Sequence, residues 1–265
     1  IDGTRLPFVG TRDLSALPLD GVDVVIDCTG VFKTEAALQP YFDSGVKKVV
    51  VSAPVKEENA LNVVFGVNHD LYDDHALVTA ASCTTNGIVP VIAALDEAFG
   101  IEHGTVTTIH SAMNDQPVLD AYHHTDLRKT RAASQSIIPV DTELARGVER
   151  ILPELTDRFS AQALRVPTLN VSSMDLTIQT TTDIDVATVN RVLAEAAAQR
   201  FDGVLGYTEE PLASCDFNHD PRSSIVDASQ TRVSGKRLVK VLTWFDNEWG
   251  YANRMLDVAE YWGRL

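Results

Sequence analysis

Short apolar runs alternate with a helix-type pattern in the first third of the chain. Residues 22–29 (VDVVIDCT) are nearly continuous in apolar character, which is typical of a strand buried on both faces of a parallel sheet. Residues 34–45 (TEAALQPYFDSG) predict a helix, and residues 47–54 (KKVVVSAP) predict a second buried strand. Further apolar runs at residues 62–67 and 76–82 are expected to continue the sheet. This order predicts βαβ connections and a doubly wound arrangement.

The pattern changes after residue 82. A helix is expected after Cys83, with a kink at Pro90, and a second helix is expected to be capped by Asp185. A long irregular segment, residues 112–136, looks too polar for a core, and a loop of this length is usually functional. Strands are predicted at residues 104–111, 170–180, 223–228 and 237–245. These segments predict a mixed or antiparallel sheet with helices.

Together the patterns predict an α/β protein. Residues 1–82 are expected to form part of a dinucleotide-binding domain, a partial Rossmann-type doubly wound parallel sheet. Residues 83–247 are expected to form an α+β catalytic domain with a mixed or antiparallel sheet. The last predicted helix, residues 248–265, would pack back on the first domain.

Charge and cysteine content narrow the possible partners. The formal net charge is −15, from 37 acidic and 22 basic residues, so a nucleic acid or an anionic membrane surface would be repelled. No apolar run approaches the roughly 20 residues of a membrane span. The three cysteines have no CxxC spacing and the histidines show no ligand pattern, which disfavours both a disulfide framework and a metal site. A cysteine pattern without a disulfide framework indicates a reducing compartment, so we expect the protein to be cytoplasmic.

Cys83 stands where a strand gives way to a helix, in the stretch TAASCTTNG. A helix N-terminus stabilises a thiolate, so Cys83 is a candidate nucleophile, although an isolated cysteine is more often a small buried apolar residue. His110 ends a predicted strand and could act as the base for such a thiol, or it could be structural. Asn247, in WFDNEWGY, could bind the carboxamide of a nicotinamide ring, or it could simply cap the last helix.

The stretches ASCTTN, TTIHSAMNDQ and WFDNEWGY together resemble the phosphorylating glyceraldehyde-3-phosphate dehydrogenase family. Supporting matches are CTGVF, VSAP, GVNHD, RAASQSIIP, RVPTLNVSSMDL and SSIVDA, so the resemblance runs through essentially the whole chain. It implies an NAD-dependent oxidation of a sugar-phosphate aldehyde, with Cys83 as the nucleophile and His110 as the base. An oxyanion would be held by the backbone N–H of Cys83 and the side chain of His110.

The same resemblance assigns residues to the cofactor and to the substrate phosphate. The positions that match cofactor-binding positions of the family are Thr29, Gly30, Phe32, Ser52, Asn114, Asn247 and Tyr251. The positions that match phosphate-binding positions are Ser82, Thr84, Arg131, Thr142 and Arg165. The resemblance also implies a homotetramer, because the long loop of the family lies at subunit contacts.

Two departures from the family pattern change this interpretation. No two of the 15 glycines have G-x-G spacing, so we expect the glycine-rich N-terminal βαβ portion to be missing and NAD binding to be weak without it. The loop that binds attacking phosphate in the family has Asp141 and Glu143 beside Thr142 here, and Met113 and Asp115 replace expected hydroxyl residues. Carboxylates oppose a phosphate dianion, so we expect water to be the acceptor.

Two alternatives stay open at this stage. The chain could be a phosphorylating member of the family with an altered phosphate loop, and the phosphate dependence of turnover would separate that case. It could also be a non-catalytic fragment or interaction module, in which Cys83 reacts with iodoacetamide no faster than free cysteine.

Overall fold

The structure is a computed structural model that describes residues 3–55, 57, 60–72, 75–123 and 125–265. Within these residues the strands form a four-stranded and a seven-stranded sheet. The helices are α1 Glu35–Asp43, α2 Cys83–Phe99, α3 Leu144–Ile151, α4 Val186–Ala198 and α5 Trp249–Gly263. Short 3-10 turns are η1 Leu14–Ala16, η2 His69–Leu71, η3 Arg128–Thr130, η4 Pro153–Leu155 and η5 Ser214–Phe217.

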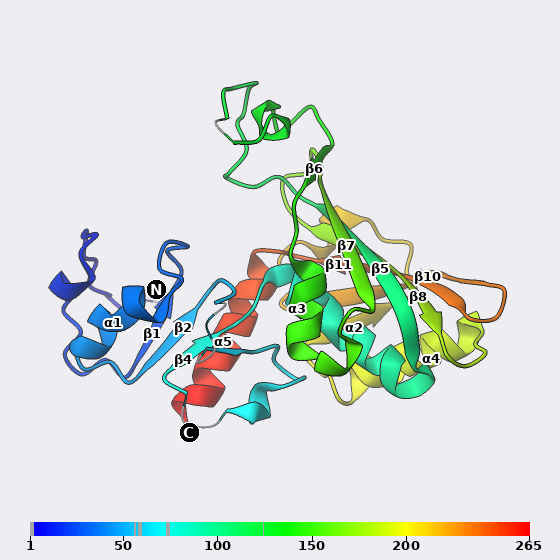
Figure 1. The fold of residues 1–265 in the computed structure, drawn as a ribbon, viewed down its shortest axis with the longest axis horizontal. Helices are drawn as coiled ribbons and strands as arrows, with labels where there is room; N and C mark the ends of the chain where they lie inside the picture. Colours follow the sequence, from blue (N-terminus) through cyan, green and yellow to red (C-terminus); the bar gives the residue numbers. More distant parts are fainter. Residues whose placement is uncertain (1–2, 56, 58–59, 73–74, 124) are drawn as a thin grey trace.

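The smaller sheet is parallel throughout and has the strand order β1-β2-β4-β3. Its strands are β1 Val24–Asp27, β2 Lys48–Val51, β3 Leu61–Asn62 and β4 Leu77–Thr79. Val49 and Val51 of β2 face a cluster that contains Leu38 of α1, whereas Val50 faces a cluster that contains Trp262 of α5. Helices therefore cover both faces, and α5 runs alongside these strands (Figure 1). The last helix thus packs against the first sheet.

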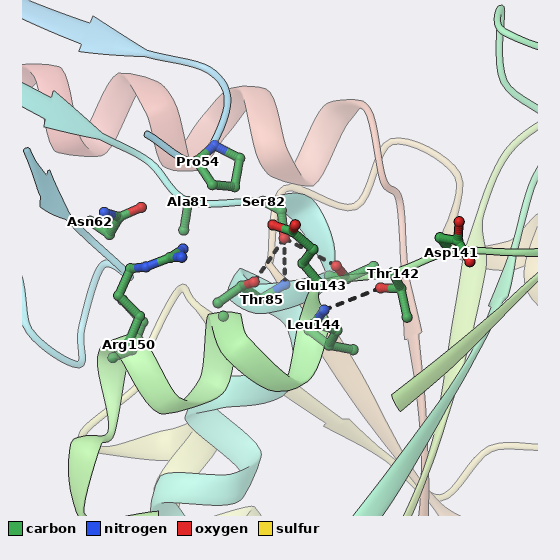
Figure 2. Close-up of a pocket in the computed structure, with 13 residues that line it drawn as sticks. Pro54, Asn62, Ala81, Ser82, Thr85, Asp141, Thr142, Glu143, Leu144 and Arg150 are labelled. Atoms are coloured by element: carbon green, nitrogen blue, oxygen red, sulfur yellow. Dashed lines mark hydrogen bonds between the residues drawn. The ribbon is translucent and has the colours of Figure 1, made fainter. Parts of the chain in front are cut away.

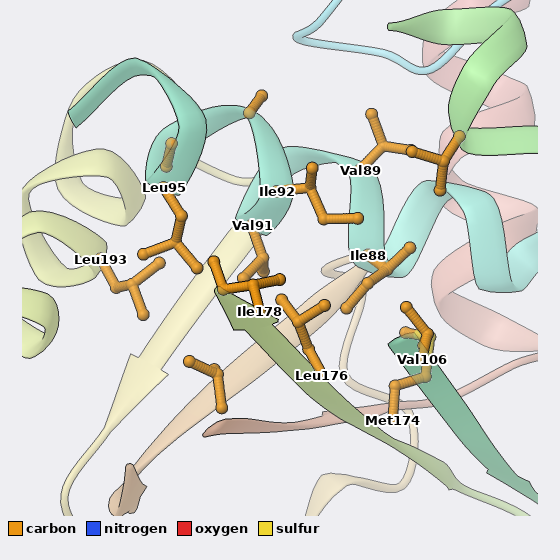
Figure 3. Close-up of a cluster of buried hydrophobic side chains, with 14 of the residues drawn as sticks. Ile88, Val89, Val91, Ile92, Leu95, Val106, Met174, Leu176, Ile178 and Leu193 are labelled. Carbon is orange, nitrogen blue, oxygen red and sulfur yellow. The ribbon is translucent and has the colours of Figure 1, made fainter. Parts of the chain in front are cut away.

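The larger sheet is mixed, with the order β6-β7-β5-β8-β11-β10-β9. Its strands are β5 Ile101–His110, β6 Ile138–Val140, β7 Phe159–Arg165, β8 Ser172–Thr180, β9 Leu205–Thr208, β10 Ser224–Ser234 and β11 Leu238–Phe245. Ile88 and Ile92 of α2 lie over Leu176 and Ile178 of β8, and all four are completely buried (Figure 3). One continuous core beneath α2 thus fixes the position of that helix on the sheet.

The structure confirms the α/β class with a parallel and a mixed sheet, and it corrects several local predictions. Residues 62–67 were expected to be a strand, but β3 ends at Asn62 and the chain turns where the side chain of Asn68 accepts a hydrogen bond from the N–H of Val64. Pro90 does not interrupt α2. Cys28, within the predicted buried strand of residues 22–29, is exposed, and so is Cys215. Where one domain ends and the next begins stays a prediction.

The segment 112–136 projects away from the body of the protein (Figure 1). It contains the 3-10 turn η3 and several strongly exposed apolar side chains, such as Tyr122 at 88 % exposure and Leu127 at 85 %. No helix in the described part of the chain is long and apolar enough to span a membrane.

Candidate active site

Cys83 is the first residue of α2, as the sequence predicted. The hydroxyl of Ser82 caps the helix by accepting a hydrogen bond from the N–H of Thr85 at 3.1 Å. Asn86 holds the preceding turn by donating to the carbonyls of Ala80 and Ser82 at 2.7 and 2.9 Å. These contacts place the thiol at the end of the helix where N–H groups are unpaired.

The residue two positions before the thiol has an unusual backbone. Ala81 has φ 53°, in the left-handed region that non-glycine residues rarely adopt. Its N–H donates to the hydroxyl of Thr79 at 2.9 Å, and its carbonyl accepts from the hydroxyl of Tyr251 at 3.0 Å. Tyr251, a predicted cofactor residue, therefore also supports the turn that carries Cys83.

His110 stands opposite the thiol at the end of β5. Its Nε2 lies 3.9 Å from the Sγ of Cys83, and its Nδ1 donates to the carbonyl of Ser111 at 2.8 Å. This donation makes Nε2 the acceptor nitrogen of a neutral imidazole. Arg165 ends β7 directly beside His110 in the parallel register, and its Nε has no hydrogen-bond partner among the described residues.

The pKa values of Cys83 and His110 do not favour the thiolate–imidazolium ion pair that a helix N-terminus and a neighbouring histidine suggest. Burial raises the pKa of the Cys83 thiol to about 11, opposed by the N–H of Thr84 and by the charge of Arg165. Burial lowers the pKa of His110 to about 4, and the positive charge of Arg165 makes the next largest contribution to this decrease. At neutral pH the structure therefore holds a protonated thiol beside a neutral imidazole, because desolvation outweighs the helix and charge effects.

A cavity of about 250 Å³ lies beside the first turn of α2 (Figure 2). Its lining joins Ser82 and Thr84 to the loop of Asp141, Thr142 and Glu143, which leads into α3. The helix α3 approaches α2 closely, since a Cβ at Gly147 would lie 2.7 Å from the hydroxyl of Thr85. Predicted phosphate residues from two distant parts of the chain thus meet in one cavity.

Sequence reasoning missed Arg150, which also lines this cavity and reaches toward Asn62 and Ala81 in Figure 2. It lies on α3, which was not predicted. Leu144, Val148 and Ile151 recur at helical spacing and are buried, so this amphipathic pattern could have revealed the helix.

The structure does not bring Arg131 to this cavity. Its exposed guanidinium pairs with Asp120 at 2.6 Å within the projecting loop. Asn114 is likewise exposed, at the base of that loop. Their phosphate-binding and cofactor-binding roles stay predictions.

The other predicted cofactor residues cluster at the carboxyl edge of the parallel sheet, where doubly wound folds bind ligands. Thr29 follows β1, and both its N–H and its hydroxyl donate to the buried carboxylate of Asp27, at 2.9 and 2.7 Å. Gly30 has φ 67° and open space where a Cβ would stand, and Ser52 follows β2. Phe32 packs partly buried beneath this turn.

Asn247 lies between β11 and α5, and the structure excludes its alternative role as a helix cap. Glu248 is the N-cap of α5, and the buried carboxylate of Asp246 accepts from the N–H groups of Glu248 and Trp249 at 3.0 and 2.8 Å. The carboxamide of Asn247 is half-buried and turns toward β5 and β8. It remains available to bind a ligand.

Comparison with protein families matches residues 82–247 to the model described as glyceraldehyde 3-phosphate dehydrogenase, C-terminal domain. The chain belongs to the glyceraldehyde 3-phosphate dehydrogenase family. This match contains Cys83, His110, Arg165 and Asn247, and it supports a dehydrogenase of this kind.

Proposed function

We propose that this chain carries the catalytic residues of an NAD-dependent D-erythrose 4-phosphate dehydrogenase. The product would be 4-phosphoerythronate, a precursor in pyridoxal 5'-phosphate synthesis, released when water hydrolyses a thioester on Cys83. The observation that carries the proposal is the pair of carboxylates, Asp141 and Glu143, on the lining of the cavity beside Cys83.

The geometry suits addition of a thiol to an aldehyde. His110 takes the thiol proton through Nε2 as the sulfur of Cys83 bonds to the carbonyl carbon, giving a thiohemiacetal. The backbone N–H of Cys83 and the protonated imidazole stabilise the oxyanion. A nicotinamide cofactor held near Asn247 would supply the hydride acceptor for the oxidation of this adduct to a thioester on Cys83. Water then adds to the thioester carbon, and its two protons pass to solvent as the carboxylate forms. The bond from carbon to the sulfur of Cys83 breaks, and the sulfur takes back the proton held by His110.

The residues at the carboxyl edge of the parallel sheet fit a nicotinamide cofactor. Gly30 leaves open space at the turn after β1, so a ligand can approach the backbone there. Asn247 offers a carboxamide at the end of β11, and Thr29 and Ser52 supply further polar groups after β1 and β2.

The two carboxylates disfavour inorganic phosphate as the acceptor. At about 6 Å and an effective dielectric of about 20, each unit charge pair costs roughly 2.8 kcal/mol before solvent screening. Both side chains are exposed, so screening reduces this cost, and Arg150 on the same lining offsets part of it. Carboxylates on the lining oppose a phosphate dianion but do not oppose neutral water.

The phosphate of the substrate would be held by Arg165, whose Nε lacks a partner among the described residues. A guanidinium is suited to phosphate because its donors match the spacing of phosphate oxygens. The hydroxyls of Ser82 and Thr84, 3.1 Å apart, lie on either side of Cys83 in the chain and would offer further hydrogen bonds.

One experiment tests the proposal directly. The protein is expressed with any coding sequence that lies upstream, and NADH formation is followed with erythrose 4-phosphate and with glyceraldehyde 3-phosphate, each with and without inorganic phosphate. Faster, phosphate-independent turnover of the four-carbon sugar is expected. Phosphate-dependent turnover of the triose would overturn the proposal.

A double variant isolates the acidic loop. Replacing Asp141→Asn and Glu143→Gln together should raise phosphate-stimulated turnover by about tenfold, because two charges opposing the dianion are removed. Glu154→Gln, in η4 and outside the cavity lining, is the matched control. Equal phosphate responses in all three proteins would contradict the role given to the loop.

A second candidate is phosphorylating glyceraldehyde-3-phosphate dehydrogenase activity. Arg150 favours it, because a guanidinium on the cavity lining can hold an anion beside Thr142. The same turnover measurement distinguishes it, since this activity requires inorganic phosphate.

We also propose a homotetramer. The projecting segment exposes Val118, Leu119, Tyr122 and Leu127, each by more than 70 %, and such a cluster is typical of an interaction surface. Light scattering at micromolar concentration should give a mass near four chains, and a monomer would contradict this proposal.

A further inference from the structure

The carboxamide of Asn247 is held by two serine hydroxyls from separate strands. The hydroxyl of Ser111 donates to the Oδ1 of Asn247 at 2.9 Å, and the hydroxyl of Ser172 donates to the same oxygen at 2.8 Å. Both serines are almost fully buried, at 0 % and 2 % exposure. The backbone N–H of Ser111 also donates to the Ser172 hydroxyl at 3.0 Å.

The sheet brings these three residues together from distant parts of the sequence. Ser111 follows β5, Ser172 begins β8 and Asn247 comes two residues after β11 ends. β8 pairs with both of the other strands, and Ser172 is opposite Phe245 in the register. The strand register therefore sets the distance between the hydroxyls and the amide.

The network fixes which end of the amide faces inward. If the carboxamide were turned over, its Nδ2 would face both hydroxyls, and their protons would lose this acceptor. Among the described residues, the hydroxyl of Ser172 would then be left with the oxygen of Ser111 as its acceptor, at 3.5 Å, which is a poor hydrogen bond. A buried donor without an acceptor is costly, so the observed orientation is the stable one.

Ser111 also contacts the candidate base. Its carbonyl accepts from the Nδ1 of His110 at 2.8 Å, while its hydroxyl donates to Asn247. Ser111 thus contacts both His110, which faces the thiol of Cys83, and Asn247, which would face the cofactor.

We propose that Ser111 and Ser172 are positioning residues that present the Nδ2 of Asn247 as a donor to the carboxamide oxygen of a nicotinamide ring. The inference deepens the proposed function, on which it rests for the cofactor. With Oδ1 occupied by two donors, the free face of the amide is its N–H group, which binds a carbonyl oxygen and does not bind a donor. Such a fixed donor would hold the ring in one orientation over the thiol.

The test measures NAD binding by calorimetry, so that it does not depend on turnover. Ser111→Ala and Ser172→Ala should each raise the Kd for NAD roughly 3- to 10-fold, the effect of losing one hydrogen bond. The KM for the sugar phosphate should change less than about twofold. Ser223→Ala is the matched control, since this serine is also buried and its hydroxyl has no partner among the described residues.

A double-mutant cycle separates positioning from general packing. Asn247→Ala should itself weaken NAD binding, and Ser111→Ala should add nothing in that background, because the hydroxyl acts through the amide. Serine variants that bind NAD like the control, or whose effects persist without the amide, would overturn the inference.

These outcomes are distinguishable from failure of the proposed function. If the wild-type protein binds NAD but oxidises neither sugar phosphate, the proposed function fails and the NAD titrations still decide the role of the serines. If the wild-type protein oxidises the sugar phosphate but the serine variants match the control, only the positioning inference fails. Absence of NAD binding by the wild-type protein, expressed with any coding sequence that lies upstream, overturns both.

Discussion

The buried imidazole of His110 predicts a loss of stability on the acid side of neutrality. Burial lowers the pKa of His110 to about 4 in the folded protein, from its ordinary value of 6.5. Between these values the unfolded chain binds more protons than the folded chain, so the free energy of unfolding rises with pH across this window. It must therefore fall as the pH is lowered from 6.5 towards 4.

The size of the effect follows from the two pKa values. Between pH 7.5 and pH 5.0, His110 alone should remove about 2 kcal/mol from the free energy of unfolding. Urea denaturation followed by circular dichroism at both pH values measures this change. Other groups titrate in the same range, so the comparison is with His110→Gln, which should lose about 2 kcal/mol less than the wild-type protein.

His103→Gln is the control, because His103 is exposed on the same strand β5. It should keep the pH dependence of the wild-type protein. Equal pH dependence in the wild type and in His110→Gln would refute the reasoning. It would mean that the pKa of His110 is the same in the folded and the unfolded protein. A larger loss in His110→Gln than in the wild type would mean that the folded protein holds His110 as an imidazolium paired with the thiolate of Cys83, and that charge pairing outweighs desolvation.

Three further predictions test the site and its support. Cys83→Ser should abolish NADH formation while the circular dichroism spectrum is unchanged, and retained turnover would rule out the thioester mechanism. Arg165→Leu should slow alkylation of Cys83 by iodoacetamide at pH 8 by roughly fivefold, because the charge of Arg165 lowers the pKa of the thiol. Arg165→Lys keeps the charge and should react nearly like the wild type. Equal alkylation rates for all three proteins would contradict the effect given to Arg165. Asp246→Ala should lower the free energy of unfolding by about 3 kcal/mol, because its buried carboxylate accepts hydrogen bonds from backbone N–H groups at the start of α5. In the same denaturant titration, Asp185→Ala should cost about 1 kcal/mol, because Asp185 is an exposed helix cap.

Local signals predicted the elements that depend on neighbouring residues. Thr34 and Asp185 accept hydrogen bonds from N–H groups three residues later, so the starts of α1 and α4 could be read from single side chains. The position of Cys83 at the first turn of α2 was predicted for the same reason, since Ser82 caps that helix. Apolar runs also predicted β2 and β4.

The features that the sequence did not reveal depend on contacts between distant segments. Strand β1 was expected to be buried on both faces, but three of its four residues are half-buried because it lies at the edge of the sheet. The protonation states of Cys83 and His110 depend on how much water the fold excludes from them. The spacing of residues along the sequence does not encode this. The contact of Ser111 with Asn247 joins residues 136 positions apart, and only the order of β5, β8 and β11 brings them together.

The thiol of Cys83 and the carboxamide of Asn247 each lie where a strand gives way to a helix, and one side chain connects these two junctions. Tyr251, on the first turn of α5, donates its hydroxyl to the carbonyl of Ala81, two residues before Cys83. Because Ala81 has a left-handed φ of 53°, its peptide groups need partners that hold them, and Tyr251 and Thr79 supply these. A change at the start of α5 can therefore move Cys83 as well as Asn247. The positions of Cys83 and Asn247 are coupled through this helix, so variants that loosen α5 should displace both side chains together.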